Sequence, residues 1–235
     1  MSEAEQQRFF ITPQHPCSYL EGYSATTLFL DPDAEVTPAL YQLLSDNGFR
    51  RSGGHLYRPH CQACNACKAS RVPVARFSPR RRHRRILRTN QDLRITVEPA
   101  HFNETHYGLF ERYVAGRHRD GEMFPANEQQ YRSFLLGAWS DTLFLCSYLD
   151  DRLVAVAVTD RQPDGLSAIY TFFEPELEAR SLGAHSILTQ IDHCQRWGLS
   201  YLYLGYWIAQ SPKMAYKASY RPIEILSDNQ WTTLT

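Results

Sequence analysis

The sequence predicts an α+β protein made of two units, and three observations support this prediction. Residues 1–75 combine a short helix pattern and a hairpin pattern with a cluster of cysteines. Residues 76–235 begin with an arginine-rich helix, and later show three strand patterns followed by a helix and a further strand. We therefore expect a small cysteine-containing N-terminal domain over 1–75 and a larger domain over 76–235.

Composition and hydropathy set the class of protein. The chain has 235 residues, of which 43% are apolar and 13% aromatic, so a packed core is expected and wholesale disorder is excluded. No run of about 18 apolar residues occurs, which excludes a membrane-spanning helix. The first residues lack the basic and apolar regions of a signal peptide. We expect a cytoplasmic protein whose six cysteines stay reduced.

The N-terminal unit shows three local patterns. Residues 23–30, YSATTLFL, are typical of a strand. A helix is expected from Pro38, a residue tolerated at the first helical position, to Gly48, which ends it. A hairpin should turn at Gly53-Gly54. The predicted apolar stripe of the helix is Leu40, Leu43 and Leu44.

The second unit shows a longer series of elements. Asn103 and Asn127 are expected to cap two helices. The strand patterns that follow cover 142–149, 152–160 and 166–173, and a helix over 183–197 precedes a strand over 199–207. An antiparallel meander that enters a β-α-β unit is the order of the N-acetyltransferase-like (GNAT) fold, so we expect a GNAT-like domain with a right-handed crossover.

The arginine-rich helix is the main charge feature. Residues 76–94 hold eight arginines and one acidic residue in a chain of zero net charge. Ser78-Pro79 should start the helix, and its arginines occupy almost every face. Without interleaved glutamates these cations repel one another, unless a polyanion such as a phosphate backbone relieves the repulsion. The run therefore favours nucleic-acid binding over a merely solvated face, through Arg80, Arg81, Arg82, Arg84, Arg85 and Arg88.

The cysteine cluster has the spacing of a metal centre. Residues 61–67, CQACNAC, give Cys61, Cys64 and Cys67 at C-x2-C-x2-C, and Cys17 could supply a fourth thiolate. Such sulfurs can converge on zinc or on an iron–sulfur cluster. Reduced thiols in a structural loop are the alternative, and the competing ligands are His15, His55 and His60. Cys146 and Cys194 fall on apolar faces and should be core residues.

Two further segments carry candidate binding groups. EARSLGAH at 178–185 joins a strand to a helix, where backbone N–H groups can bind an anion. Arg180 and Gly183 fit the R/Q-x-x-G-x-G/A loop of proteins that bind acetyl-CoA, but His185 takes a place that needs a small residue. A tight connection without a ligand is the alternative. The segment 205–222 concentrates lysines and aromatic residues after the last strand, as either an anion pocket or an exposed loop.

These motifs together resemble a known family. HPCSYL (15–20), the stretch 50–67, the arginine run 76–93, RHRDGEM (117–123), FFEPELEARSLG (172–183) and the segment 202–222 are similar to the bacterial aspartate/glutamate leucyltransferases, relatives of eukaryotic arginyl-tRNA–protein transferases. The resemblance spans nearly the whole chain. It implies transfer of leucine from leucyl-tRNA to the α-amino group of proteins that begin with Asp or Glu, which marks them for degradation in the N-degron pathway.

The resemblance also implies roles for particular residues. The basic helix and Arg180 would bind tRNA, and Glu174 or, second, Asp192 would accept a proton from the attacking amine. The acidic N-terminus would meet cations and tyrosines of the presumed cleft, namely Arg117, His118, Lys213, Tyr216, Lys217, Tyr220 and Arg221. Neither a cofactor for the chemistry nor coenzyme A nor a membrane is expected.

Two departures limit what the resemblance implies. The eukaryotic relatives carry CxxC near the N-terminus, whereas Leu20 stands at the matching place after Cys17, so an iron–sulfur centre is not carried over. The resemblance separates leucyl from arginyl transfer poorly. Two other hypotheses remain at this stage: a GNAT acyltransferase that uses acetyl-CoA, and a non-enzymatic nucleic-acid-binding module with a zinc knuckle.

Overall fold

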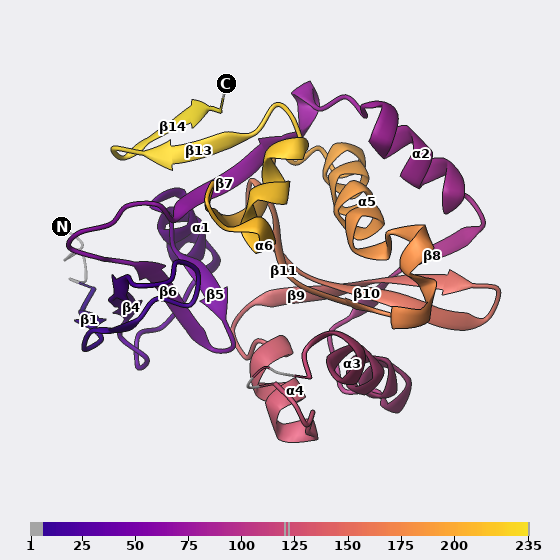
Figure 1. Cartoon of the computed structure of the whole chain (residues 1–235), viewed down its shortest axis with the longest axis horizontal. Coiled ribbons are helices and arrows are strands. Elements are labelled where there is room, and N and C mark those ends of the chain that lie inside the picture. The colour runs from indigo at the N-terminus through magenta and orange to yellow at the C-terminus, as the bar shows by residue number, and fades with distance from the viewer. Residues whose placement is uncertain (1–6, 120, 122, 235) are drawn as a thin grey trace.

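The computed structural model describes residues 7–119, 121 and 123–234, and it is built on a large eight-stranded sheet (Figure 1). The order of the large sheet is β14-β13-β7-β12-β11-β10-β9-β8, and a smaller sheet has the order β1-β4-β6-β5. The strands are β1 (Phe9–Ile11), β2 (His15–Pro16), β3 (Ser24–Ala25), β4 (Thr27–Leu30), β5 (Arg50–Ser52), β6 (His55–Pro59), β7 (Lys68–Pro73), β8 (Leu93–Pro99), β9 (Asp141–Leu149), β10 (Arg152–Arg161), β11 (Gly165–Phe173), β12 (Tyr201–Trp207), β13 (Glu224–Ser227) and β14 (Gln230–Thr233).

Helices cover both faces of the large sheet. The α-helices are α1 (Pro38–Asp46), α2 (Arg81–Thr89), α3 (Glu104–Arg117), α4 (Glu128–Leu135), α5 (Leu182–Arg196) and α6 (Pro212–Ala215), and the 3-10 helices are η1 (Val74–Arg76), η2 (Pro175–Arg180) and η3 (Tyr216–Ser219). Helices α5 and α2 lie on one face, and α3 and α4 lie on the other (Figure 1). Within the described residues, none of these helices is long and apolar enough to cross a bilayer.

The interior strand β10 shows why the sheet needs two helical layers. Residues 153–160 of this strand are buried without alternation, which is the pattern of a strand covered on both faces. Val156 and Val158 pack in the core under α3 and α4, whereas Val154 and Ala155 pack with Leu182 at the start of α5. The sheet is therefore the rigid body on which the candidate site is built.

Most of the elements predicted for the N-terminal unit are confirmed. Thr37 caps α1, where its hydroxyl accepts from the backbone N–H of Leu40, and Gly48 follows the helix with φ of +83°. Strands β5 and β6 form the predicted hairpin. The predicted apolar stripe is wrong at Leu43, which is 59% exposed, because Tyr41 faces the core in its place.

The elements predicted for the second unit are confirmed. Asn103 caps α3 and Asn127 caps α4 through side-chain oxygens that accept backbone N–H groups. Strands β9, β10 and β11 form an antiparallel meander, and β12 pairs with β11 in parallel after α5. This is the strand order that suggested a GNAT-like domain, and the mixed α/β architecture follows from it directly.

Strand β7 joins the two units. Its residues 68–73 belong to the stretch expected in the N-terminal unit, but in the structure they pair with β12 and β13 inside the large sheet. The strands β8, β13 and β14 were also not predicted from the sequence. The polypeptide therefore enters the large sheet before residue 76, directly after the cysteine cluster.

Candidate functional site

Helix α2 presents its arginines to solvent. It begins at Arg81 with Arg80 as its N-cap, two residues after the predicted start, and it buries His83 and Ile86. The six predicted tRNA-binding arginines of this helix are all exposed, and none forms an ion pair with another described residue: Arg80, Arg81, Arg82, Arg84, Arg85 and Arg88. Their positive charge is thus available to an external anion.

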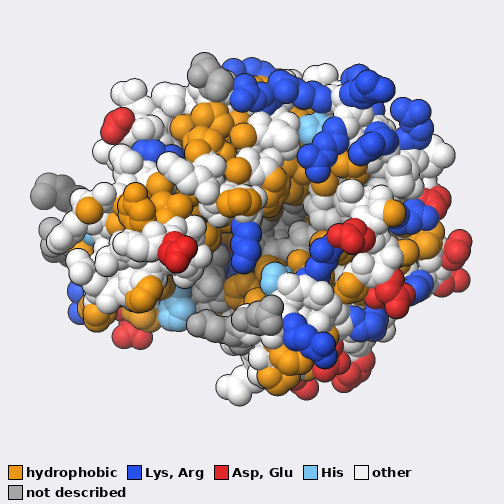
Figure 2. All heavy atoms as spheres, viewed as in Figure 1, with side chains coloured by type: hydrophobic (Ala, Val, Ile, Leu, Met, Phe, Trp, Pro, Cys, Tyr) orange, Lys and Arg blue, Asp and Glu red, His pale blue; other side chains and the backbone are white. Residues whose placement is uncertain are grey.

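A groove beside α2 gathers arginines from three segments. Figure 2 shows a band of Lys and Arg side chains along the edge formed by α2 and its neighbours. The groove is lined by Arg76, Arg80, Arg81, Arg84 and Arg221, among other residues. Arg221 was predicted to bind the acidic acceptor, but it lies in this groove with the arginines of α2. Sequence reasoning missed Arg76, which precedes the helix and pairs with Glu224.

Arg180 is engaged within the protein. Its guanidinium forms a bidentate pair with Asp92, with distances of 2.8 and 2.9 Å, and also donates to the carbonyl of Thr89. Asn90 in turn donates its amide to the carbonyl of Arg180. These contacts tie η2 to the end of α2, so Arg180 fixes the helix whose arginines remain exposed.

The strands β11 and β12 diverge and open the sheet. They pair only at Gly165–Ser167 with Tyr201–Tyr203, although β11 continues to Phe173 and β12 to Trp207. Figure 2 shows a hollow near the middle of this face, beside α6 as located in Figure 1. The hollow and the band of cationic side chains along α2 lie on the same face of the molecule.

Four of the predicted acceptor residues, Arg117, His118, Lys213 and Tyr216, lie in one group with Tyr113 beside α6. His118 is half-buried at the end of α3, and its pKa is lowered by burial and then by the neighbouring Lys213 and Arg117. Tyr113, which sequence reasoning missed, stacks edge-on against His118 at 5.3 Å between ring centroids. It also packs against Phe173 of β11 at 4.9 Å.

The remaining contacts complete this group of residues. Arg117 forms an ion pair with Glu178 at 3.1 Å, and Lys213 is exposed on α6. Tyr216 is 47% exposed and lies near the phenol of Tyr113, whose pKa is raised first by burial and in part by Tyr216. We refer to Tyr113 and Phe173 as the aromatic floor of this group beside α6, and to Arg117 and Lys213 as its cationic rim.

Lys217 is buried next to Tyr216. Its ammonium donates to the carbonyl of Tyr206 at 2.6 Å and lies 5.5 Å from the ring centroid of Tyr216. Burial, followed by the nearby guanidinium of Arg50, lowers the pKa of Lys217 to about 8. The sequence analysis did not identify Arg50 as a site residue. The one signal for it was local: Arg50 and Arg51 are neighbours in a strand of the hairpin, and alternate side chains of a strand face inward.

Tyr220 is buried against α2. It is 2% exposed and stacks on His83 of α2, with 5.1 Å between ring centroids and 9° between ring planes. In this structure its ring docks α2 on the segment that follows α6, and its contact with substrate stays a prediction. This stack connects the arginine helix to the segment that carries Tyr216 and Lys217.

The two predicted bases have other partners. Glu174 follows β11, is 1% exposed, and its Oε2 accepts from Arg112 at 3.1 Å and from Arg152 at 2.7 Å. Two guanidinium groups on one oxygen favour an anchoring role for this carboxylate over proton transfer. Asp192 lies on α5 and pairs with Arg196 one turn later at 2.8 Å. It borders a cavity between α5 and α2, away from the rim residues of the hollow.

The loop before α5 is closed by the protein itself. Ser181 takes a left-handed conformation with φ of +53°, and a Cβ on Gly183 would lie 3.3 Å from the ring of Phe173. His185 is 6% exposed, and burial lowers its pKa to about 4. The guanidinium and the carbonyl of Arg180, next to this loop, are both held by the end of α2.

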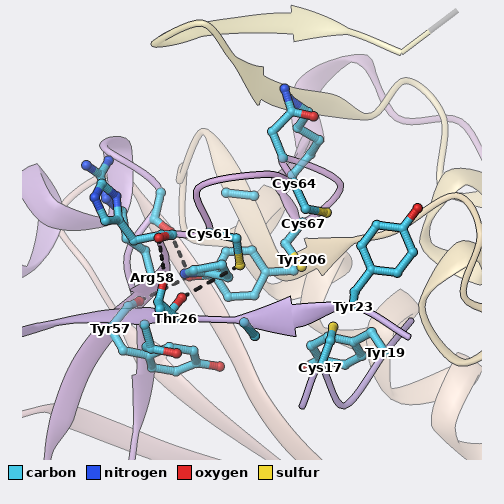
Figure 3. Close-up of a pocket in the computed structure, with 18 of the residues that line it drawn as sticks. Cys17, Tyr19, Tyr23, Thr26, Tyr57, Arg58, Cys61, Cys64, Cys67 and Tyr206 are labelled. Carbon is cyan, nitrogen blue, oxygen red and sulfur yellow. Dashed lines mark hydrogen bonds between the residues drawn. The ribbon is translucent and has the colours of Figure 1, made fainter. Parts of the chain in front are cut away.

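The four predicted metal ligands line one pocket. Cys17, Cys61, Cys64 and Cys67 border a cavity of about 430 Å³, and Figure 3 shows Cys17 on a separate segment beside Tyr19 and Tyr23. Burial, and then the three other cysteines, raise the pKa of Cys67 to about 12.

The sulfur atoms are more widely spaced than in a closed zinc site. Among the described residues, no three of these sulfurs lie within 4.8 Å of one another. A tetrahedral structural zinc site would bring all four sulfurs within about 4 Å, at bond lengths near 2.3 Å. Cysteine thiolates are ligands of both zinc and iron–sulfur clusters, so these four residues suit either group chemically. In the structure the cavity separates their sulfur atoms.

A second group of metal-type ligands lies elsewhere in the core. Glu98, His106 and Cys146 offer ligand atoms within 4.8 Å of one another. His106 lies 3.3 Å from a Glu98 oxygen, and its Nδ1 has no partner in the described part of the chain. Cys146 is buried, as the sequence predicted. This group packs under α3, between β8 and β9 and away from the hollow.

Comparison with known proteins reveals a full-length relationship. A family model for the N terminus of arginine-tRNA-protein transferases matches residues 15–85, and a model for their C terminus matches residues 105–227. Two solved structures with low similarity match about three quarters of this chain and about half of their own. They are the C-terminal domain of a putative lysylphosphatidylglycerol synthetase from Agrobacterium fabrum (14% identity, TM-score 0.45) and L-PGS from Bacillus licheniformis (13%, 0.44).

Curated relatives match the chain from end to end. A protein of Alcanivorax borkumensis is 54% identical over 98% of this chain and 96% of its own length. Proteins of Pseudomonas paraeruginosa and Hahella chejuensis are 50% and 48% identical over the whole of both chains. All three are named aspartate/glutamate leucyltransferase. This chain therefore belongs to the aspartate/glutamate leucyltransferase family of aminoacyltransferases.

Proposed function

We propose that this protein transfers leucine from leucyl-tRNA to the α-amino group of proteins that begin with Asp or Glu, and so marks them for degradation. The observation that carries this proposal is that the exposed arginines of α2 and the hollow lie on one face, where a single tRNA can reach both (Figure 2). The names of the full-length relatives support leucine as the transferred group and acidic residues as the acceptor.

The arginine groove would hold the phosphate backbone of the acceptor arm. Arg76, Arg81, Arg84 and Arg221 come from three segments and would contact successive phosphates, with release of counterions. The 3′ end with its leucyl ester would enter the hollow. The aromatic floor formed by Tyr113 and Phe173 suits an apolar leucyl side chain.

The chemistry requires positioning and the movement of one proton. The neutral α-amine attacks the leucyl carbonyl, a C–N bond forms, and the ester bond to the ribose oxygen breaks. The amine proton leaves and the ribose hydroxyl gains one, directly or through water. Since the ester is already activated, holding the amine against the carbonyl supplies much of the acceleration, and no cofactor is required.

His118 is the residue we assign to proton transfer. Its lowered pKa keeps the imidazole neutral at pH 7, because burial and the charges of Lys213 and Arg117 disfavour the imidazolium. It lies in the group of residues beside α6, near Lys213 and Arg117, whereas Glu174 and Asp192 are each held by arginines. Glu174 would keep β11 and η2 in place beside the hollow.

The cysteine pocket would have a structural role. If a zinc ion or an iron–sulfur cluster binds, Cys17, Cys61, Cys64 and Cys67 would hold it, and it would cross-link the segment before β3 to the loop before β7. The lining of this pocket is distinct from the rim of the hollow. The transfer step proposed above uses no residue of the cysteine pocket.

A transfer assay tests the proposal. Several aminoacyl-tRNAs, each with a labelled amino acid, are paired with peptides that differ only in their first residue. We expect leucine to be transferred to peptides beginning with Asp or Glu, and acetyl-CoA to be unused. Transfer of arginine in preference to leucine would reassign the donor. Absence of transfer from every aminoacyl-tRNA, with tRNA binding intact, would favour a binding module instead.

A further inference from the structure

Two cationic side chains fill the gap where β11 and β12 separate. Arg50 enters from β5 of the N-terminal unit and donates to the hydroxyl of Ser167 at 2.9 Å and to the carbonyl of Ala168 at 2.8 Å. Lys217 enters from η3 and donates to the carbonyl of Tyr206. The accepting groups on Ser167, Ala168 and Tyr206 lie where the pairing of β11 with β12 ends. The two cations therefore take the place of hydrogen bonds that continued strand pairing would have made.

Both cations are buried without an acidic partner. Arg50 is 7% exposed and Lys217 is 5% exposed. Across residues 7–119, 121 and 123–234, neither has a carboxylate oxygen within 4.0 Å, whereas the adjacent Arg51 is fully paired with Asp160. A buried charge without a counter-ion is costly. Two such charges, close enough for one to lower the pKa of the other, make a strong site for an anion.

We propose that Arg50 and Lys217 form the subsite that binds the side-chain carboxylate of an N-terminal Asp or Glu. This inference rests on the proposed function and names the residues that select its acceptor. A guanidinium has five N–H donors, and hydrogen bonds within the protein account for two of them here. The Lys217 ammonium donates to the carbonyl of Tyr206 and to the sulfur of Met214, which leaves one of its three donors free. A carboxylate therefore finds free donors on both cations.

The location suits the reaction. Lys217 adjoins Tyr216 of the same segment, at 5.5 Å from the ammonium to the ring centroid. A carboxylate bound below Tyr216 would leave the α-amine of the same residue near the floor where the leucyl ester would lie. Other cations are less suited, because Arg117 pairs with Glu178 and Arg221 lies in the groove beside α2.

The arrangement predicts strong discrimination against amides. Asn and Gln have the shape of Asp and Glu but bring no charge, so they would leave both cations uncompensated. A site whose buried polar groups lose their partner rejects the wrong substrate far more strongly than an apolar pocket does. The specificity of the enzyme would thus depend on a residue from each unit, Arg50 and Lys217.

The test compares matched peptides on matched variants. Peptides that begin with Glu or Gln, and are otherwise identical, are assayed with the full-length wild-type protein and with Lys217→Gln, Lys217→Arg and Arg50→Lys. We expect Lys217→Gln to reduce the preference for Glu over Gln by about 100-fold or more, through KM for the peptide. Binding of leucyl-tRNA should be unchanged, and Lys217→Arg and Arg50→Lys should retain part of the preference.

Lys213→Gln is the control, since Lys213 is an exposed cation of the adjacent helix. If Lys213→Gln abolishes the preference and Lys217→Gln does not, the subsite is at the rim and the proposal is overturned. If wild-type protein transfers leucine to neither peptide, the proposed function fails instead. Thermal melting of each variant separates loss of specificity from loss of the fold.

A measurement on the wild-type protein avoids the folding problem. The chain contains three lysines, so their side-chain carbon signals can be assigned by NMR with single Lys→Arg variants. The Glu peptide should shift the Lys217 signal, and the Gln peptide should shift it much less. An unmoved Lys217 signal at saturating Glu peptide would refute the assignment.

Discussion

His118 carries the most specific prediction for a single residue. His118→Asn keeps a polar side chain of similar size but removes the group that accepts a proton. We expect kcat to fall by about 100-fold or more, because general-base catalysis typically contributes that much. In the wild-type protein the rate should fall only at pH below 6.5, since the pKa of His118 is lowered. Rates measured from pH 5 to 8 check both points.

The comparison of pH profiles decides the role of His118. If His118 acts as the base, the acidic limb of the profile disappears in His118→Asn. A variant that keeps this limb and loses affinity for the acceptor would show that His118 only binds. Lys213→Gln serves as the control, because removal of its charge should raise the pKa of His118 and shift the limb upward.

Glu174 is predicted to stabilise the structure. Glu174→Gln weakens the ion pairs with Arg112 and Arg152. The two guanidinium groups are about half exposed, so we expect the free energy of unfolding to fall by only about 1–2 kcal/mol. Denaturant titration measures this loss, and Arg152→Gln should give a similar one. A rate at pH 7 reduced more than 100-fold in a fully folded Glu174→Gln variant would restore its assignment as the base.

His185 should make the protein less stable in acid. Burial lowers its pKa from 6.5 to about 4, so the unfolded chain binds a proton at this residue more readily than the folded chain does. The contribution of neutral His185 is complete above pH 6.5 and is lost as pH falls towards 4. The loss is on the order of 3 kcal/mol. His185→Gln should show a shallower decline of unfolding free energy between pH 6.5 and 4, and an unchanged decline would contradict this.

At the scale of elements, α2 is predicted to bind phosphate. Replacement of Arg81, Arg82, Arg84 and Arg85 by Gln leaves the buried His83 and Ile86 in place, so the helix should still dock. We expect weaker tRNA binding and a salt dependence flatter by about one unit per lost phosphate contact. Binding measured at several salt concentrations gives this slope.

A matched set of arginines controls for net charge. Arg132 and Arg161 are exposed but pair with acidic neighbours away from α2. Their replacement by Gln should leave the slope unchanged. Equal slopes in the α2 variant and in the wild-type protein would rule out the helix as the tRNA contact.

Local signals predicted most elements, because their causes are local. Asn103 and Asn127 cap helices with their own side chains, and Gly48 and Gly198 end helices in left-handed conformations that glycine adopts without strain. The prediction for Leu43 was wrong because spacing alone does not choose between neighbouring faces of a short helix. Strand β7 was missed as part of the large sheet because its partners are 128 or more residues away, in β12 and β13.

At the scale of the whole molecule, Asp160 holds the N-terminal unit on the large sheet. It accepts from Arg51, Tyr41 and Thr142, and neither it nor Arg51 is exposed to solvent. Asp160→Asn should reduce the free energy of unfolding by about 3–5 kcal/mol, because it leaves Arg51 buried without a counter-ion. Denaturant unfolding measures the loss.

Asp141 provides the control for this prediction. It pairs with Arg161 at the end of the same strand pair, but both side chains are about half exposed. Asp141→Asn should therefore cost about 1 kcal/mol or less. Similar losses for the two variants would show that the Asp160 pair does not anchor the N-terminal unit.

The sequence by itself determined the helices, the meander, the cationic helix and the resemblance that carries the family. Each of these depends on residues close together in the chain, whose spacing and chemistry can be read directly. Only the tertiary structure decided which groups face one another: Arg50 beside Lys217, Tyr220 on His83, and Arg221 with the arginines of α2. These contacts join residues 137 to 167 positions apart in the chain. The packing of the sheet and its covering helices fixes them, and no local pattern encodes that packing.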